Sequence, residues 1–363
     1  MNELEALIIL TTLLRSAPKV IYLINHFGSA LATLKEPLTK IAELPGFNAE
    51  LLSFWKKGLE EKVWKEDLAR IERLNVHVIS FKDAGYPKKL LEISDFPPVI
   101  FVKGHLYKSD YRSLAIVGTR QASIYGLEMA KEISKKLARA GFTIVSGLAR
   151  GVDTAAHEGA LEAGRTLAVL GSGLGCIYPS ENSLLAQKIS EQGAVLSEFS
   201  INAPPEKFNF PRRNRIVSAM TMGTILIEAP LKSGAMLTAE RALAQGRPLF
   251  TIPGRADLDS FKGNHCLIKT GRAKLIENAE DVIQYFDDLP FPLMPMPSSV
   301  RGILEKDEQE FLNLMPSKEL SIEEISLCMA WPIAKINSLL MSLVLKKMVK
   351  EYPGKFYKKN SHV

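Results

Sequence analysis

Short apolar runs separated by amphipathic segments occupy the middle of the chain and predict its architecture. The runs do not alternate with polar residues, which is the pattern of buried parallel strands, and helical segments such as 125–140 and 184–191 lie between most of them. Right-handed crossovers then produce a doubly wound sheet. We therefore expect an α/β fold with an extended Rossmann-like, mostly parallel sheet over residues 113–289. The expected strands are 114–117, 143–145, 167–170, 194–196, 224–227 and 249–252.

The region before this core has a helical pattern. In residues 1–75, apolar residues recur at three- and four-residue spacing, and Leu44-Pro45-Gly46-Phe47 interrupts them with a turn. This pattern resembles a sterile-alpha-motif (SAM) or helix-hairpin-helix module, and a plain helical bundle is the alternative. Residues 76–112 hold several prolines and read as a connector with one or two strands.

The region after the core divides into a linker and a small domain. Alternate prolines in 290–300 disfavour helix and predict an extended linker. In residues 301–363 the pattern predicts three helices, at 307–313, 322–329 and 334–347, and then a two-strand wing. We interpret this as a winged-helix-like domain, which would serve either to contact duplex DNA or to dock a protein.

Composition and charge limit the classes of partner. The net charge of +6 favours a polyanion, and 46% hydrophobic residues are enough for a large core. The three cysteines stand far apart, without the spacing of a zinc site or a disulfide framework, which suits a reducing cytoplasm. No apolar stretch reaches the roughly 18 residues of a membrane span. We expect a cytoplasmic protein without a membrane partner.

Small and polar residues follow four of the predicted strands. The carboxyl ends of parallel strands meet at one edge of a sheet, where ligands bind and helix N-termini favour anions. One glycine cluster after a strand is usually only a turn, but four on the same edge predict a phosphate-binding surface. Its candidates are Gly118, Thr119, Arg120, Ser146, Gly147, Arg150, Gly151, Ser233 and Thr238, together with the glycines of 171–175.

A basic and aromatic segment at 207–215 adds the strongest functional signal. Aromatic rings stack on unpaired bases, and guanidinium and ammonium groups hold phosphates, so the segment predicts contact with a single strand. The alternative is a basic loop whose arginines pair with carboxylates such as Glu198 and Glu228. The candidate contacts are Lys207, Phe210, Arg212, Arg213, Asn214 and Arg215.

Catalytic patterns are weak in this sequence. Residues 171–176 come close to GxGxxG, but the sixth residue is Cys176 and no helix opens there, and GxxxxGK[ST] does not occur. His157 lies one helical turn after Asp153, a predicted N-cap, and a core histidine is the better interpretation. We therefore predict no catalytic residues, no metal ligands and no cofactor.

Taken in order, these motifs resemble the DNA-processing protein A (DprA/Smf) family over about residues 85–285. The motifs are VGTR at 117–120, SGLARGVD at 146–153, AVLGSGL at 168–174 with YP at 178–179, LSE at 196–198, FPRRNR at 210–215, IEA at 227–229 with SG at 233–234 and TA at 238–239, and PG at 253–254. The resemblance implies an extended Rossmann-like fold that binds single-stranded DNA. It also implies a non-enzymatic mediator that delivers the strand to the RecA recombinase in natural transformation, working as a homodimer through its Rossmann-like domain. Lys207 and Phe210 match a lysine and an aromatic residue that contact DNA, and Arg150 matches an arginine on the phosphate side.

Two positions depart from the family pattern. His265 stands where the family has Asn in Gly-x-Asn-x-Leu-Ile, and Arg272 stands between Gly271 and Ala273, where a Gly-Ala pair is usual. The alternative function comes from nucleotide-cleaving phosphoribohydrolases of the LOG or lysine-decarboxylase-like type. The segment 233–240 resembles their glycine-rich motif only loosely, because it lacks two glycines and its Glu240 is shifted.

Overall fold

The computed structural model describes residues 1–288, 306–316, 318, 320–329, 331–345, 348–352 and 356–359. The chain divides into two compact units, residues 1–293 and 294–363. The proline-rich segment 290–300, predicted to be a linker, lies outside the described residues.

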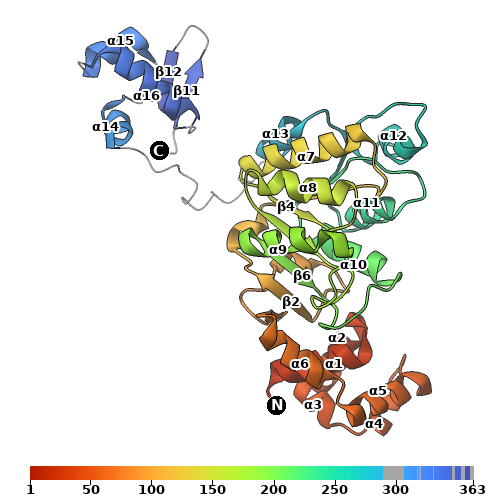
Figure 1. Ribbon diagram of the computed structural model, residues 1–363. Helices are drawn as coiled ribbons and strands as arrows, with labels where there is room; N and C mark the ends of the chain where they lie inside the picture. Colours follow the sequence, from red (N-terminus) through yellow and green to blue (C-terminus); the bar gives the residue numbers. More distant parts are fainter. Residues whose placement is uncertain are drawn as a thin grey trace. The chain divides into compact units, whose positions relative to one another are not determined.

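One sheet organises the first unit. Within residues 1–288, nine strands follow the order β1-β2-β6-β5-β4-β3-β7-β8-β9. Figure 1 labels β2, β6 and β4 of this sheet. The strands from β6 to β9 are parallel, and β1 and β2 join antiparallel beside β6. The predicted α/β class is confirmed. The strands are β1 (His77–Ser80), β2 (Val99–Gly104), β3 (Ser113–Val117), β4 (Thr143–Ser146), β5 (Thr166–Val169), β6 (Ala194–Ser197), β7 (Gly223–Leu226), β8 (Leu249–Thr251) and β9 (Lys274–Leu275).

Helices cover both faces of the sheet, because successive side chains of each central strand point to opposite faces. In β3, Leu114 and Ile116 belong to an apolar cluster with residues of α7, α8 and α13, whereas Ala115 and Val117 belong to a cluster with residues of α10 and α11. The core helices are α7 (Ile124–Arg139), α8 (Val152–Leu161), α9 (Ser183–Gln192), α10 (Asn209–Ala219), α11 (Gly234–Ala244), α12 (Lys262–Lys269) and α13 (Ala279–Asp287). Short 3₁₀ segments are η1 (Lys88–Glu92), η2 (Lys108–Tyr111), η3 (Ser180–Asn182) and η4 (Asp259–Phe261).

The N-terminal helical module packs on the β2 side of the sheet. Leu10, Leu13 and Trp55 share one buried apolar cluster with Phe101 of β2 and Ile189 of α9. The predicted turn at 44–47 separates two of the helices. The helices are α1 (Glu3–Leu14), α2 (Ala17–Phe27), α3 (Ala30–Lys35), α4 (Leu38–Ala42), α5 (Ala49–Glu61) and α6 (Trp64–Arg73).

Residues 76–112, interpreted from the sequence as a connector, belong to the sheet instead. Both strands of this region, β1 and β2, pair with each other, and β2 also pairs with β6. The prolines that suggested an extended connector, Pro87, Pro97 and Pro98, all lie in the segment between β1 and β2. The segment therefore widens the core by two antiparallel strands.

The second unit has helices and strands near the predicted positions, and it also has a strand that the pattern did not predict. Its helices are α14 (Lys306–Leu314), α15 (Ile322–Met329) and α16 (Ile333–Leu345), and its strands are β10 (Leu320–Ser321), β11 (Val349–Tyr352) and β12 (Phe356–Lys359). The unpredicted strand is β10, before α15, and the strands form a sheet in the order β10-β12-β11. The assignment as a winged helix stays a prediction.

The order of the strands reverses beside β3. The chain builds β3, β4, β5 and β6 outward in one direction and then places β7 on the other side of β3. In open parallel sheets, a crevice forms at such a switch point, outside the carboxyl ends of the strands. The loops after β3, β4 and β7 meet there.

Candidate nucleic-acid interface

A groove of about 910 Å³ lies at this switch point, and we call it the carboxyl-edge groove. It is bounded by the loops after β3 and β4, by α10 and by the start of α11. Most of the residues predicted from the sequence line it: Gly118, Thr119, Arg120, Gly147, Arg150, Lys207, Phe210, Arg213, Asn214, Ser233 and Thr238.

Helix α10 supplies one wall of the groove through a helical stripe. Phe210, Arg213, Asn214 and Val217 line the groove, and this i, i+3, i+4, i+7 spacing places them on one face of the helix. Pro211 lies in the first turn, where the missing N–H removes no intrahelical bond. The sequence interpretation treated this segment as a basic stretch and missed that it forms a helix, which sorts its arginines onto different faces.

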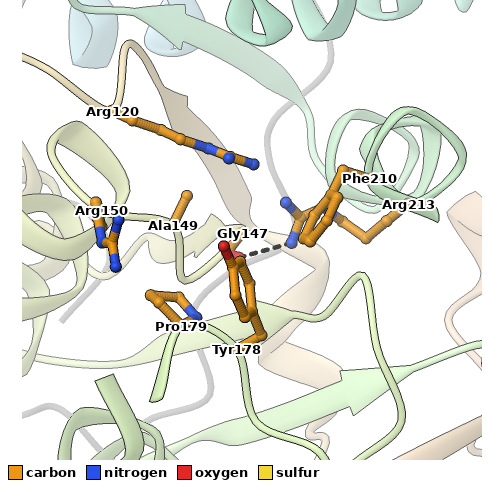
Figure 2. A pocket seen from close by; sticks show the side chains of 8 residues that line it. All are labelled: Arg120, Gly147, Ala149, Arg150, Tyr178, Pro179, Phe210 and Arg213. Atoms are coloured by element: carbon orange, nitrogen blue, oxygen red, sulfur yellow. Dashed lines mark hydrogen bonds between the residues drawn. The ribbon is translucent and has the colours of Figure 1, made fainter. Parts of the chain in front are cut away.

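An arginine and two rings form the centre of the groove (Figure 2). The Arg120 guanidinium lies 5.2 Å from the centroid of the Phe210 ring, and the Tyr178 ring lies 5.6 Å from Phe210 at an interplanar angle of 52°. Tyr178 and Pro179 also line the groove's inner pocket beside Arg150. Tyr178 was not among the predicted contacts, although its position after a glycine-rich strand end was the available signal.

Arg213 supports the floor of the groove from inside. It is 4% exposed, and its Nη1 donates to the carbonyl oxygen of Gly147 at 2.6 Å and to that of Val169. Burial lowers the pKa of Arg213 to about 10, against the attraction of Asp153. Its charge is retained at neutral pH, and its Nη1 is hydrogen-bonded to backbone carbonyl oxygens while the side chain lines the groove, so direct contact of Arg213 with a strand stays a prediction. Gly147 allows this approach, because a Cβ there would overlap the guanidinium.

Arg215 points away from the groove, contrary to the sequence prediction. Its Nη2 lies 2.6 Å from Glu198 Oε2 and its Nε lies 3.1 Å from Asp95 Oδ2, with 5% of the side chain exposed. The alternative interpretation, in which Glu198 anchors an arginine of this segment, is confirmed for Arg215. Burial raises the pKa of Glu198, and the Arg215 charge opposes that effect.

Three other candidates also lie outside the groove lining. The Arg212 guanidinium lies 5.3 Å from the centroid of the Phe199 ring, on another face of α10. The Ser146 hydroxyl is fully buried and donates to the carbonyl oxygen of Ile116 at 2.6 Å. Gly151 has φ of +75° and a Cβ there would meet the Thr119 carbonyl oxygen at 2.5 Å, so it serves the turn rather than a ligand.

The loop after β4 is held by Asp153, although not as the predicted N-cap. Asp153 is the second residue of α8, and its Oδ2 accepts hydrogen bonds from the N–H groups of Gly147 at 3.0 Å and Ala149 at 3.4 Å. Burial raises the pKa of this carboxyl. The aspartate therefore fixes the loop that carries Arg150.

The cations of the groove differ in how free they are. Lys207 is exposed, and no carboxylate among the described residues lies within ion-pair distance of its amine. Arg150 is also exposed, but its guanidinium pairs with Glu181 through Nε–Oε1 and through Nη2–Oε2 at 3.1 Å. A phosphate would have to compete with Glu181 for Arg150.

Polar groups of α11 form the opposite wall. Ser233 caps the helix by accepting from the Met236 N–H at 3.3 Å. The Asn214 amide donates to the Gly234 carbonyl oxygen at 3.3 Å, which ties α10 to α11. Thr238 donates to the same carbonyl oxygen at 3.3 Å and is almost fully buried. These groups shape the wall more than they offer free donors.

The residues considered for catalysis do not converge. Glu228 accepts hydrogen bonds from the N–H and the hydroxyl of Ser123, at 3.0 and 2.7 Å. Glu240 is half-exposed on α11 and pairs with Arg272. His157 is fully buried beside Thr166, as expected of a core histidine. Among the described residues, no cluster of three or more His, Cys, Asp or Glu side chains could hold a metal ion.

The two departures from the family pattern lie near the end of the core. His265 Nε2 lies 2.9 Å from the Gly254 carbonyl oxygen, while the neighbouring Asn264 is buried and binds the backbone of β7 and its following loop. Arg272 is exposed and pairs with Glu240. Neither departure alters the lining of the carboxyl-edge groove.

Comparison with known proteins gives a consistent result. The family described as DNA recombination-mediator protein A matches residues 77–287. Protein Smf of Escherichia coli is 36% identical over 314 residues, which cover 84% of this chain and 81% of that protein. DNA processing protein DprA of Streptococcus pneumoniae is 42% identical over 210 residues, 57% of this chain and 73% of that protein.

Solved structures agree with the sequence matches. The X-ray structure of DprA from Streptococcus pneumoniae superposes with a TM-score of 0.66 at 33% identity, over 78% of this chain and 98% of that one. A structure from Helicobacter pylori, whose subject is the single-stranded DNA binding mode of DprA, gives 0.53 at 32% identity, over 58% and 95%. In the part of the chain that the structure describes, no helix is both long and apolar enough to span a membrane.

Proposed function

Because this chain belongs to the DNA recombination-mediator protein A family, we propose that its carboxyl-edge groove binds single-stranded DNA. The observation that carries the proposal is the arrangement of Lys207, Arg120 and Phe210 around one open groove. The two cations suit phosphates and the rings of Phe210 and Tyr178 suit unpaired bases, a combination that fits a single strand better than a duplex with stacked bases. The Helicobacter pylori structure, whose subject is a single-stranded DNA binding mode, supports a single strand as the ligand.

The test is a titration of labelled single- and double-stranded oligonucleotides at several salt concentrations. We expect tighter binding to the single strand and a steep loss of affinity with salt, because each neutralised phosphate releases counterions. Lys207→Ala should weaken binding and reduce the salt slope by about one unit. Equal or tighter binding to a duplex of the same length contradicts the proposal.

We propose further that the bound strand is passed to the RecA recombinase, during DNA uptake in natural transformation or during recombination. The family's description as a recombination mediator supports this role. RecA assembly on single-stranded DNA should be faster with the protein present, and Lys207→Ala should lose most of that effect. An effect on RecA that is the same for parent and Lys207→Ala would separate RecA binding from strand binding.

We also propose a homodimer built on the Rossmann-like core. Joining two grooves raises the affinity for a long strand through effective concentration. β9 supports the core as the dimer region, because it is an edge strand with both residues exposed, and Leu275 is 48% exposed. Mass measurements in solution should show a dimer, and Leu275→Glu should shift it toward a monomer with weaker binding to long strands. A parent that stays monomeric at high concentration contradicts this part.

The role that we propose is non-enzymatic. The alternative, a phosphoribohydrolase of the LOG or lysine-decarboxylase-like type, would need the Glu240 region at the groove, but Glu240 pairs with Arg272 on the surface. Incubation with nucleoside monophosphates should release no base. Turnover that Glu240→Gln or Glu228→Gln abolishes would promote the alternative.

A further inference from the structure

Helix α10 presents a second face that the groove does not use. Phe208 and Arg212 are one helical turn apart, so they project on the same side, away from the stripe of Phe210, Arg213 and Asn214. Phe208 is 59% exposed. The Phe210 ring is already in contact with Arg120 and Tyr178, whereas the Phe208 ring is open to a ligand.

This face adjoins the N-terminal helical module. A pocket there is lined by Phe208, the N-cap of α10, by Arg212 of α10, and by Thr11, Arg15 and Ser16 from the end of α1 and the start of α2. In Figure 1, the segment before α10 reaches toward α1 and α2. We call Phe208, Arg212 and Arg15 the α10 outer patch.

The patch has the residue types of the groove. The Arg15 guanidinium lies 5.3 Å from the centroid of the Phe54 ring, a ring that is 45% exposed. The Arg212 guanidinium lies over Phe199. Within the described part of the chain, neither guanidinium has a carboxylate at ion-pair distance, although the Arg212 charge is close enough to Glu198 to oppose the rise in the pKa of that carboxyl. Rings with guanidinium groups stacked on them are the surface on which unpaired bases and phosphates bind.

The patch is continuous with the groove. Lys207 and Pro205 line the groove, while Glu206, Phe208 and Pro204 line the outer pocket, so a single stretch of backbone forms the rim between the two. We propose that a single strand longer than the groove continues over this rim and binds the α10 outer patch, which makes the N-terminal module part of the strand-binding surface. This inference rests on the proposed function and extends its site.

Two carboxylates, Glu198 and Glu206, lie near the patch and affect how it would bind a phosphate. Glu198 lies in the outer pocket, but its Oε2 is 2.6 Å from Arg215 Nη2, so its charge is paired within the protein. Glu206 is half-buried on the rim between the two sites. Its charge opposes a phosphate that crosses the rim, so Glu206→Gln should tighten the binding of a long strand and leave a short one unchanged.

The experiment compares two oligodeoxythymidine lengths on the full chain, because a strand of about six nucleotides occupies one groove and one of about twenty also reaches the patch. Phe208→Ala and Arg15→Gln should each weaken the longer strand by about fivefold or more and change the shorter by less than about twofold. Lys207→Ala should weaken both lengths. Phe208→Trp should keep the parent's affinity, and its added fluorescence should be quenched by the longer strand only.

Matched controls lie at the opposite edge of the sheet. Tyr111→Ala removes a ring that is 51% exposed, and Arg139→Gln removes an exposed arginine from the last turn of α7. Neither should change the binding of either oligonucleotide. The proposal is overturned if Phe208→Ala and Arg15→Gln leave the longer strand unchanged, as a protein-docking patch would, or weaken both lengths equally. If Lys207→Ala leaves the shorter strand unchanged, the proposed function fails instead.

Discussion

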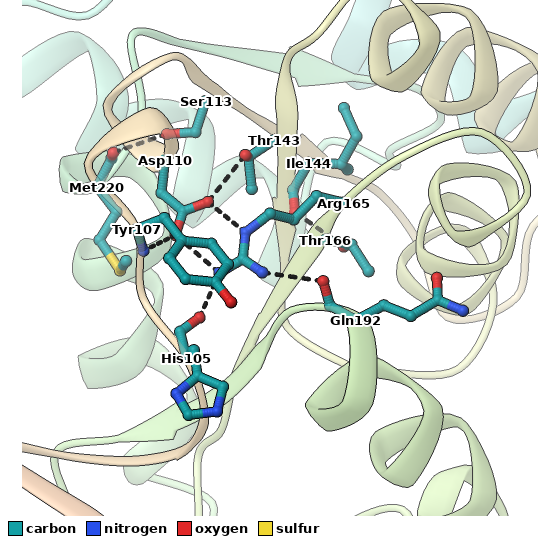
Figure 3. A network of polar contacts seen from close by, with 10 residues as sticks. All are labelled: His105, Tyr107, Asp110, Ser113, Thr143, Ile144, Arg165, Thr166, Gln192 and Met220. Carbon is teal, nitrogen blue, oxygen red and sulfur yellow. Dashed lines mark hydrogen bonds and ion pairs between the residues drawn. The ribbon is translucent and has the colours of Figure 1, made fainter. Parts of the chain in front are cut away.

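The two edges of the central sheet use the same chemical group in opposite ways. At the amino edge, where the parallel strands begin, Arg165 lies against the Tyr107 ring, with its guanidinium 4.4 Å from the ring centroid. Its nitrogens donate to groups of Asp110, His105 and Gln192 (Figure 3). Its Nε lies 2.6 Å and its Nη2 lies 2.9 Å from the Asp110 carboxylate, and its Nη1 donates to the Gln192 carbonyl oxygen at 2.9 Å. At the carboxyl edge, Arg120 lies over Phe210 with no such carboxylate among the described residues.

The difference shows that an arginine on an aromatic ring does not by itself indicate a ligand site. What separates the two ring-stacked arginines is a buried carboxylate that pairs with Arg165 and has no counterpart beside Arg120 among the described residues. Asp110 is 8% exposed at its side chain, accepts from Thr143 at 3.0 Å and closes the amino-edge network from within. The groove leaves Arg120 and Lys207 without such a partner, so an anion from outside can take that place. The variants Phe208→Ala and Arg15→Gln, described above, test on the α10 outer patch whether an arginine without a carboxylate partner binds an external anion.

The largest expected effect is the loss of stability when the carboxylate of the amino-edge network is removed. Asp110→Ala leaves the Arg165 guanidinium, whose side chain is 17% exposed, without its carboxylate, which should lower the free energy of unfolding by about 3–5 kcal/mol. Thermal or denaturant unfolding measures this. Strand binding by the folded fraction should not change. Asp257→Ala, which breaks an exposed pair with Arg255, is the control and should leave stability unchanged. Equal stability of Asp110→Ala and the parent would show that the network is not structural.

Removal of the aromatic ring at the centre of the groove should instead reduce the affinity for a single strand. Phe210→Ala removes the ring on which Arg120 rests and on which a base would stack, so affinity for a single strand should fall by about 1–3 kcal/mol. Fluorescence anisotropy with a short oligonucleotide measures the change. Phe210→Tyr keeps a ring and should bind like the parent. Loss of affinity in Phe210→Tyr as large as in Phe210→Ala would mean that stacking is not the contribution of this residue.

A buried histidine between the edges gives a pH-dependent prediction. His157 lies against Thr166 Oγ1 at 2.7 Å, and because that hydroxyl donates to the Ile144 carbonyl oxygen, the His157 Nδ1–H is the donor. Nε2 is buried without a partner, and burial lowers the pKa of His157 to about 3 from 6.5.

Between these two pH values the unfolded chain binds the extra proton, so the histidine's contribution to stability is lost as pH falls below about 6.5. By pH 5 the loss should reach about 2 kcal/mol. The measurement is the free energy of unfolding from pH 7 to 4 for the parent and for His157→Leu, which has no titrating group. The variant should lose less stability over that range, and parallel curves would contradict the prediction.

Much of the fold could be predicted because parallel strands and their helices leave local signals. The apolar runs at 114–117 and 194–196 became β3 and β6 nearly unchanged. The strands β1 and β2 were not recognised as part of the sheet. β2 joins the sheet by pairing with β6, which lies about a hundred residues along the chain, and β1 joins by pairing with β2. No local pattern records the distant partner.

The sequence predicted which residue types form the site, but not the direction in which each side chain points. The strand ends and Lys207, Phe210 and Arg120 were found because glycines, rings and cations carry a chemical signal at known spacing. Arg213 and Arg215 carry the same signal but point inward. Their partners are the Gly147 backbone for Arg213 and Glu198 with Asp95 for Arg215, groups that are brought near only by the folded sheet. Residue type predicts what a side chain can bind, and the fold decides whether a protein group has already bound it.

The smallest expected effect concerns Arg150, which lines the groove like Arg120 but is paired with a carboxylate like Arg165. Arg150 faces the groove but shares its guanidinium with Glu181, and both side chains are about half-exposed. Because water screens such a pair, its strength is low, and a phosphate can displace Glu181 at a modest cost. Glu181→Gln should therefore bind a short single strand a few-fold more tightly at low salt, and the gain should shrink as salt rises. Glu162→Gln, which removes a similarly exposed carboxylate at the C-cap of α8 that pairs with Lys131 and Lys135 of α7, is the matched control and should not change affinity. If Glu181→Gln binds more weakly than the parent, Glu181 holds Arg150 in its binding orientation, and the pair belongs with the closed network around Arg165.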